Sequence, residues 1–151
     1  MALQDRIDQD IKTAMLARDE ARLRGLRAIK AAILLARAEK GPGAALTEEA
    51  EIKVLQKLAK QRRESADIYQ QQNRQDLYTI EVEELNVIES YLPEQLDRSA
   101  VEAAVRAIVT ETGASGPKDV GKVIGLANQR LAGRAEGRTI AEIAKALLTG
   151  S

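Results

Sequence analysis

Apolar residues recur along most of this chain at intervals of three and four, the spacing that gathers side chains on one face of an α-helix. At the start of the chain, the pattern predicts a helix from residue 3 to about 17. It predicts a second helix, capped by Asp19, that extends to Lys40. Glycine and proline in the following segment, 41–43, end that helix because neither continues a helix without cost. No segment has the polar–apolar alternation of a half-buried strand, so the sequence predicts an all-α fold.

The next two helices are predicted over residues 48–72 and from about 77 to Pro93, on either side of the polar segment 70–76. Thr47 precedes them as an N-cap, and three glutamates in the first turn suit the positive end of the helix dipole. This is a hairpin of long antiparallel helices. The side chains expected to face inward from it are Ile52, Leu55, Ala59, Ala66, Tyr69, Leu77, Ile80, Ile88 and Tyr91.

Two charged residues, Arg62 and Glu84, interrupt the apolar stripes of this hairpin. Each lies eleven residues from Asn73, so a turn centred on Asn73 places both at the same level. We predict that they form a partly buried ion pair. Such a pair serves the specificity of helix pairing more than stability, because desolvation offsets most of the Coulomb attraction. The alternative is that each side chain extends separately to the surface.

The last third of the chain contains three shorter predicted helices, over residues 99–113, 117–131 and 138–148. Ser99 followed by Glu102 predicts a capping box at the start of the first. The two predicted domains are an N-terminal helical domain, residues 1–95, and a small three-helix bundle, residues 96–151.

The middle helix of this bundle has two distinct predicted faces. Valine, isoleucine, alanine and leucine side chains form the core face, and the opposite side gathers Lys118, Lys122, Gly125 and Gln129, with Gly121 beside them. Glycine inside a helix costs about 1 kcal/mol relative to alanine, so these glycines need a reason. Three explanations stay open: packing on the N-terminal domain, docking of an external partner, and no role.

Cations continue into the loop after this helix. We predict that Arg130, Arg134 and Arg138, together with Lys118 and Lys122, contact the phosphates of a nucleic acid. The glycines do not form a nucleotide-hydrolysing loop, because the Gly-Lys-Ser/Thr ending and a preceding strand are both missing.

The composition restricts the chemistry further. The 151 residues include no cysteine and no histidine, which removes thiol nucleophiles, Cys/His zinc sites and the usual general base near neutral pH. We therefore predict no catalytic residue, no metal site and no cofactor. Lysine plus arginine and aspartate plus glutamate balance at 23 each, but residues 11–40 are basic and residues 41–97 acidic. An anionic partner would prefer the basic segments, unless these charges are only solvated helix faces.

The first ten residues, MALQDRIDQD, lack the apolar core of a secretory signal. No segment has 18 uninterrupted apolar residues, the approximate length of a membrane span. The sequence accordingly predicts a cytoplasmic protein with no membrane partner.

Several stretches resemble a known family. They are LRAIKAAI (26–33), KQRRES (60–65), ESYLPEQL (89–96), GASGPKDVGKVIG (113–125) and GRAEGRTI (133–140). Together they resemble the YqeY family, over essentially the whole chain. The C-terminal part of that family is similar to the tail domain of GatB, the B subunit of the glutamine-dependent aspartyl/glutamyl-tRNA amidotransferase. The resemblance implies helical N-terminal and three-helix tail domains. Glu136 departs from it, since the family usually has aspartate there, which implies a weaker helix cap.

Three functions compete for this sequence. The first is an RNA-binding accessory module for tRNA or another structured RNA, because the resemblance implies a tRNA-contacting tail. The second is an adaptor that docks a protein partner on the Gly121/Gly125 face. The third, also implied by the resemblance, is a carbon–nitrogen ligase with glutamine as amide donor, although the sequence contains no matching catalytic constellation. A second basic contact surface is also open, on the helix with Arg18, Arg22, Arg27 and Lys30.

Overall fold

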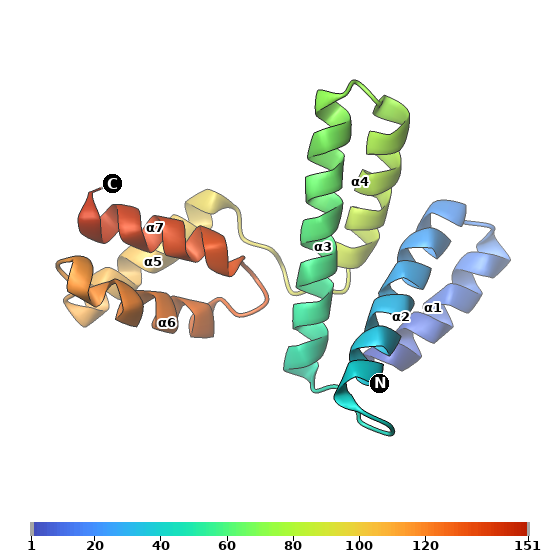
Figure 1. The fold of residues 1–151 in the computed structure, drawn as a ribbon, viewed down its shortest axis with the longest axis horizontal. Helices are drawn as coiled ribbons and strands as arrows, with labels where there is room; N and C mark the ends of the chain where they lie inside the picture. Colours follow the sequence, from blue (N-terminus) through green and yellow to red (C-terminus); the bar gives the residue numbers. More distant parts are fainter. Residues whose placement is uncertain (1, 151) are drawn as a thin grey trace. The chain divides into compact units, whose positions relative to one another are not determined.

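The computed structural model describes residues 2–150, and all regular elements in that range are helical, which confirms the predicted all-α class (Figure 1). The chain divides into two compact units, residues 1–92 and 93–151. The first unit contains α1 (Leu3–Ala17), α2 (Glu20–Lys40), α3 (Glu48–Gln71) and α4 (Gln75–Glu89). The second contains α5 (Arg98–Thr112), a 3₁₀ turn (Pro117–Asp119), α6 (Val120–Arg130) and α7 (Gly137–Thr149).

Local sequence signals set the helix ends of the first unit. Asp19 caps α2 by accepting a hydrogen bond from the amide of Arg22 at 3.1 Å, and Thr47 caps α3 by accepting one from the amide of Ala50 at 3.1 Å. Both caps confirm the sequence prediction. Asn73 turns the chain between α3 and α4 with φ of 57°, a left-handed conformation that asparagine tolerates better than most residues.

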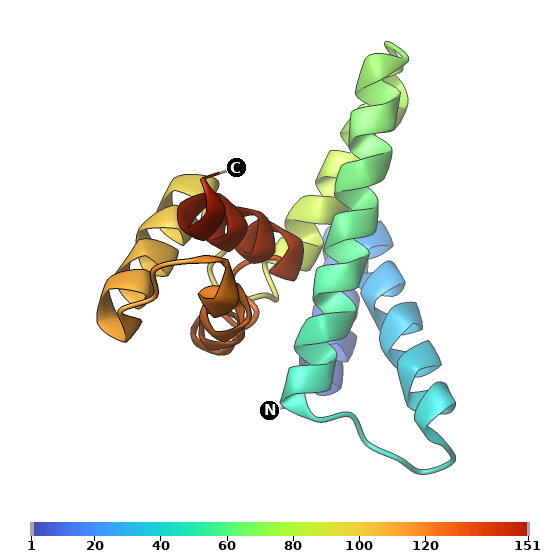
Figure 2. The same ribbon diagram turned by 60° about the vertical axis from the view of Figure 1, so that its left-hand side comes forward.

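The first unit is built from two helical hairpins, α1–α2 and α3–α4, joined where α2 packs on α4 (Figures 1 and 2). Leucine, isoleucine and alanine side chains from all four helices form its core, and Ile7, Leu26, Ile29, Ala59 and Ile88 are fully buried. One inward assignment is wrong: Ile80 is 39% exposed. It lies on α4 near the turn, and periodicity identifies an apolar face without showing whether another element covers it.

Gly25 provides the close contact between α2 and α4, which the sequence analysis did not anticipate. A Cβ atom at Gly25 would lie 2.7 Å from Cβ of Val87 and 2.9 Å from its Cγ1. Real side chains do not approach so closely, so glycine is needed here for packing, at the expense of about 1 kcal/mol in helix propensity. Gly25 is buried in the core of the first unit.

The Arg62–Glu84 pair joins α3 to α4 as the sequence proposes. Arg62 Nε donates to Glu84 Oε2 at 2.7 Å and lies 3.7 Å from Glu81 Oε2, with all three side chains largely buried. Burial raises the pKa of Glu81, the nearby Arg62 charge opposes that rise, and Glu84 adds to it. On the other side of α4, Arg24 of α2 donates to Glu83 at 2.7 Å. Arg24 Nε also lies 4.0 Å from Glu84 Oε1, so Glu84 is near two guanidiniums, whereas Glu81 is near that of Arg62.

Tyr91 lies just after α4 and contacts α1. Its hydroxyl donates to Asp10, and the guanidinium of Arg6 lies 5.3 Å from the ring centroid, within cation–π range. Burial, followed by the hydrogen bond and charge of Asp10, raises the pKa of Tyr91 from 10.0 to about 12.

We expect the Tyr91 phenol to ionise about two pH units later than an ordinary tyrosine. Absorbance at 295 nm is measured from about pH 9 to 13, on both sides of the expected midpoint, and the difference between wild type and Tyr91→Phe isolates this phenol. Because the folded-state pKa is raised, the contribution to stability is present below about pH 10 and is lost as the pH rises toward 12. Asp10→Asn should lower the midpoint, and a wild-type midpoint near 10 would contradict the contact.

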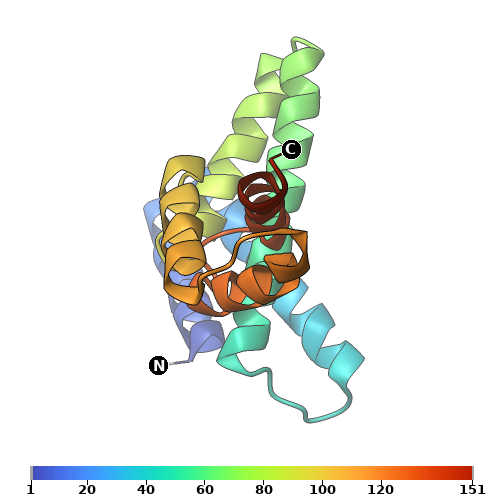
Figure 3. The ribbon, with the colours of Figure 1, turned by 90° about the vertical axis from the view of Figure 1, so that its left-hand side faces the viewer.

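The second unit encloses its own core between α5, α6 and α7 (Figure 3). Val105, Val123, Ala127 and Ala144 are fully buried there. The predicted Ser99–Glu102 capping box is wrong, because α5 begins at Arg98 and the amide of Ala100 donates to Asp97 Oδ1 at 2.8 Å. Asp97 is therefore the N-cap residue, and Ser99 lies inside the first turn of α5.

Candidate nucleic-acid interface

The outer side of α6 and the preceding 3₁₀ turn carries the residues predicted as a binding face. Lys118, Gly121, Lys122, Gly125 and Gln129 are all exposed. The valine and alanine side chains of the opposite face point into the core of the second unit. Lys118 belongs to the 3₁₀ turn (Pro117–Asp119) and not to α6, whose first residue is Val120, so the predicted helix start at 117 is corrected by three residues.

The two glycines of this face border open space. A Cβ atom added at Gly121 or at Gly125 would meet nothing within 4 Å. Their helical backbone is thus bare, in contrast with that of Gly25, where a neighbouring helix occupies the space. The packing of the second unit therefore does not account for glycine at 121 and 125.

Lys118 and Lys122 form no ion pair within the part of the chain that the structure describes. The nearest acid in sequence, Asp119, accepts a hydrogen bond from the amide of Ser115 at 3.0 Å. That amide, with smaller contributions from Gly116 and the charges of both lysines, lowers the pKa of Asp119. The carboxylate therefore stays ionised beside the lysines, and the local charge is two positive against one negative.

Two arginines predicted to bind phosphate are engaged with local acids. Both terminal nitrogens of Arg130 donate to Glu111, at 2.6 and 2.7 Å, and this pairing lowers the pKa of Glu111. Arg138 donates to Glu142 at 3.2 Å. Exposed ion pairs are weak, so a phosphate could compete for these guanidiniums, but their charge is already offset.

The basic helix considered as a second surface is also partly neutralised. Lys30 lies 2.7 Å from Asp8, and Arg22 lies 4.0 Å from Asp10, both in α1. Arg18 and Arg27 are both exposed. These cations do not converge on one site.

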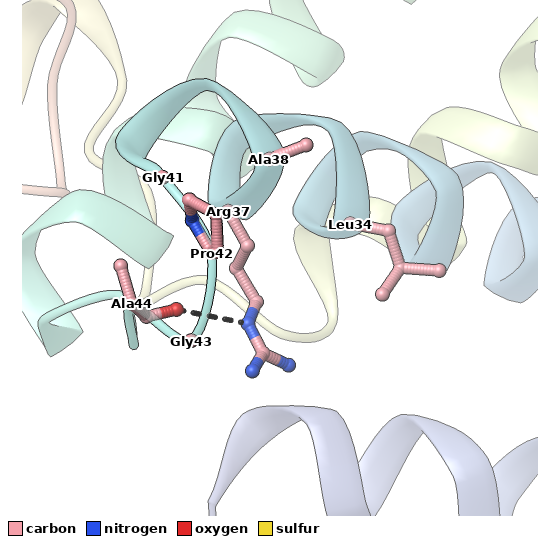
Figure 4. A pocket seen from close by; sticks show the side chains of 7 residues that line it. All are labelled: Leu34, Arg37, Ala38, Gly41, Pro42, Gly43 and Ala44. Carbon is pink, nitrogen blue, oxygen red and sulfur yellow. Dashed lines mark hydrogen bonds between the residues drawn. The ribbon is translucent and has the colours of Figure 1, made fainter.

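A hollow of about 450 Å³ lies at the end of α2, where the chain turns through Gly41, Pro42 and Gly43 (Figure 4). The Arg37 side chain extends across it, and its Nε donates to the carbonyl of Ala44 at 3.4 Å. A second nitrogen of Arg37 donates to Gln4. Apart from Arg37 the lining is apolar or glycine, so the hollow offers neither an acid–base pair nor a nucleophile.

Over residues 2–150, no cluster of three or more acidic, histidine or cysteine side chains is arranged to hold a metal ion. None of the helices in that range is both long enough and apolar enough to span a bilayer.

A family model described as "Yqey-like protein" matches residues 4–148, nearly the whole chain. The chain belongs to the YqeY-like family. Two fungal relatives share 37% identity with it, over 86 and 91 residues. Each is named "Altered inheritance of mitochondria protein 41, mitochondrial", one from Meyerozyma guilliermondii and one from Clavispora lusitaniae. The matched segments cover 57% and 60% of this chain and 44% and 52% of those proteins, so the chain spans about half the length of the curated relatives it matches.

These relatives contradict the predicted cytoplasmic location, because both are named as mitochondrial proteins. That prediction depended on the lack of an apolar signal core. Mitochondrial targeting uses amphipathic, arginine-rich segments instead, so the missing core did not distinguish the two compartments.

In this YqeY-like chain, two of the family stretches contact each other within the second unit. The amide of Leu96 donates to the carbonyl of Arg134 at 2.9 Å, and the Gln95 side chain donates to the carbonyl of Gly133 at 2.6 Å. Arg134 Nε in turn donates to the carbonyl of Glu94 at 3.4 Å. The loop after α6 is therefore hydrogen-bonded to the segment before α5. Arg134 is half-buried in that contact.

Glu136 occupies the N-cap of α7, where the family usually has aspartate. Its side chain forms no capping hydrogen bond. Aspartate is the better N-cap residue, so a weaker cap at this position stays a prediction.

Proposed function

We propose that this YqeY-like protein is a non-catalytic accessory module that binds structured RNA, with tRNA as the first candidate. The proposed contact face consists of Lys118, Gly121, Lys122 and Gly125. The observation that carries the proposal is that both lysines are exposed without an ion pair in the described residues, beside glycine backbone that borders open space. Phosphates could approach the bare backbone closely and be neutralised by the two ammonium groups.

Recognition on this face would depend on shape and charge. The three tyrosines of the chain are Tyr69, Tyr78 and Tyr91, and all lie in the first unit. The second unit thus has no aromatic ring on which a base could stack. Lysine acts as a point charge toward phosphate and reads no base identity by itself. The proposed binding is therefore directed to a folded RNA backbone and not to a sequence.

The first test measures how much Lys118 and Lys122 contribute to tRNA binding. We expect Lys118→Glu with Lys122→Glu to weaken tRNA binding at least about tenfold, since two attractive contacts become repulsive. Binding is measured by fluorescence anisotropy with labelled tRNA, and circular dichroism checks that helicity is kept. The matched control is Arg106→Glu with Lys145→Glu, which changes the net charge of the second unit equally, on α5 and α7.

Salt dependence tests the phosphate contacts directly. Lys118→Gln with Lys122→Gln should reduce the slope of log affinity against log salt by about 1.4 to 1.8, the value for two lost contacts. If Arg106→Glu with Lys145→Glu weakens tRNA binding as much as Lys118→Glu with Lys122→Glu, net charge alone is responsible for the loss. Undiminished binding by the Lys118/Lys122 variants would refute this face.

The adaptor function is the second candidate, because the open space at Gly121 and Gly125 would equally suit a closely packed helix. A protein complex that survives nuclease digestion and is lost in Gly121→Ala with Gly125→Ala would favour the adaptor over RNA. Amide transfer is not part of either proposal.

A further inference from the structure

The first unit contains a groove between α2 and α3. Its residues are distant in sequence from Lys118, Gly121, Lys122 and Gly125 of the second unit. The two helices separate toward the segment that joins them, as Figure 2 shows. The groove has a volume of about 210 Å³. Its α2 side includes the small side chains of Ala32 and Ala36, and its α3 side includes Leu58. The small side chains on α2 leave an apolar hollow that α3 does not fill.

The rim of this groove contains a large apolar side chain that the fold does not cover. Leu35 is 63% exposed, and it lines the same groove. A protruding leucine and an apolar hollow thus lie on one surface. Contiguous exposed apolar surface of this kind marks interaction sites.

The rim is also charged, with opposite signs on its two sides. Glu39 lies on α2 and Lys57 on α3, both exposed, and neither forms an ion pair within residues 2–150. In a two-fold symmetric pair, residue i of one copy contacts residue j of the other, and j contacts i. A two-fold axis passing between Glu39 and Lys57 therefore brings each glutamate to a lysine of the second copy. Leu35 lines the same groove one helical turn from Glu39, so the same operation brings Leu35 of each copy close to the groove of the other.

We propose that the α2–α3 groove is a self-association site whose occupant is a second copy of this chain. Leu35 of each copy inserts beside α3 of the other, and the two Glu39–Lys57 contacts fix the register. The groove is small, at about 210 Å³, and small interfaces, well below about 1,200 Å², are weak and transient. The dimer is accordingly one that forms at high protein concentration.

Sedimentation velocity measures the association on full-length protein freed of nucleic acid, from roughly 10 µM to 1 mM. The weight-average mass should rise with concentration from 16.4 kDa toward twice that value. Leu35→Lys should weaken association at least tenfold. Leu16→Lys is the matched control, because Leu16 is 88% exposed but lies in α1, outside the groove, and this change should have no effect.

Charge reversal tests the arrangement independently of the leucine. Glu39→Lys alone and Lys57→Glu alone should each weaken association, because each places like charges opposite one another. The double variant should associate like wild type, and an equimolar mixture of the two single variants should associate more strongly than either alone. Circular dichroism confirms that each variant is folded.

Three results would overturn the proposal. The first is wild-type protein that stays monomeric at 1 mM. The second is association that Leu35→Lys does not change. The third is a double charge variant that associates no better than the weaker single variant, which would reject the two-fold pairing.

Discussion

Gly25→Ala lowers the free energy of unfolding of the first unit by about 1 to 3 kcal/mol, the usual cost of inserting a methyl group into a well-packed contact. The added Cβ would lie 2.7 Å from Cβ of Val87, an atom fixed to the α4 backbone and not the far end of a flexible side chain. Relief of the clash therefore requires α2 and α4 to move apart. The higher helix propensity of alanine, about 1 kcal/mol, offsets only part of that cost.

The measurement uses tyrosine fluorescence during urea unfolding, because all three tyrosines lie in the first unit. Gly125→Ala is the matched control: its Cβ enters open space, so the second unit gains up to about 1 kcal/mol and the tyrosine signal is unchanged. The double variant Gly25→Ala with Val87→Gly should lose less stability than the sum of the two single losses, because the second change removes the side chain that the first one meets. A Gly25→Ala variant as stable as wild type would show that the α2–α4 contact is looser than described.

Arg62→Met is expected to destabilise the first unit by about 2 to 3 kcal/mol at neutral pH. Methionine keeps most of the side-chain volume and helix propensity but leaves Glu81 and Glu84 facing each other without the guanidinium between them. Removing one partner of a fully buried pair costs about 3 to 5 kcal/mol, and the partial exposure of these side chains reduces that figure.

The pH dependence identifies the cause of this loss. The pKa of Glu81 is already raised in the folded protein, so its ionised form disfavours folding, and this penalty disappears as the pH falls below the folded-state pKa. Without Arg62 the pKa rises further. The stability difference between Arg62→Met and wild type should therefore begin to narrow as the pH falls through the raised pKa of Glu81, before ordinary glutamates are protonated.

Lys30→Met is the control for the ion pair. Lys30 lies 2.7 Å from Asp8 with both side chains about two-fifths exposed, so its removal should cost less than about 1 kcal/mol. Adding Glu81→Gln and Glu84→Gln to Arg62→Met should restore much of the lost stability at neutral pH. A pH-independent loss in Arg62→Met would assign the effect to packing instead of charge.

Local sequence signals predicted most helix ends because each depends on a few neighbouring residues. Asp19 and Thr47 are caps as expected, and Asn73 turns the chain at the centre of the predicted hairpin. The register of Arg62 and Glu84 followed from that turn by counting residues. The failures include Ser99, which Asp97 replaces as the cap of α5, the start of α6, which is Val120 and not residue 117, and the inward assignment of Ile80, which is 39% exposed.

The candidate binding face was only partly predictable. Helical periodicity placed Lys122, Gly121 and Gly125 on the side of α6 opposite its apolar residues. It did not reveal that Glu111 pairs with Arg130, or that Arg134 contacts the segment before α5, because those partners lie 19 and 40 residues away. Of the five predicted cations, the three arginines contact local acids or carbonyls, and the two lysines form no ion pair in the described residues.

The sequence by itself determined the helical class, most helix ends, the register of the α3–α4 hairpin and the two faces of α6, since all of these depend on spacing within one or two elements. Only the tertiary structure decided that Gly25 packs closely against Val87 of α4 while Gly121 and Gly125 border open space. A glycine has the same local signal in both settings. What differs is whether another helix occupies the volume beside it, and that volume is set by residues distant in sequence.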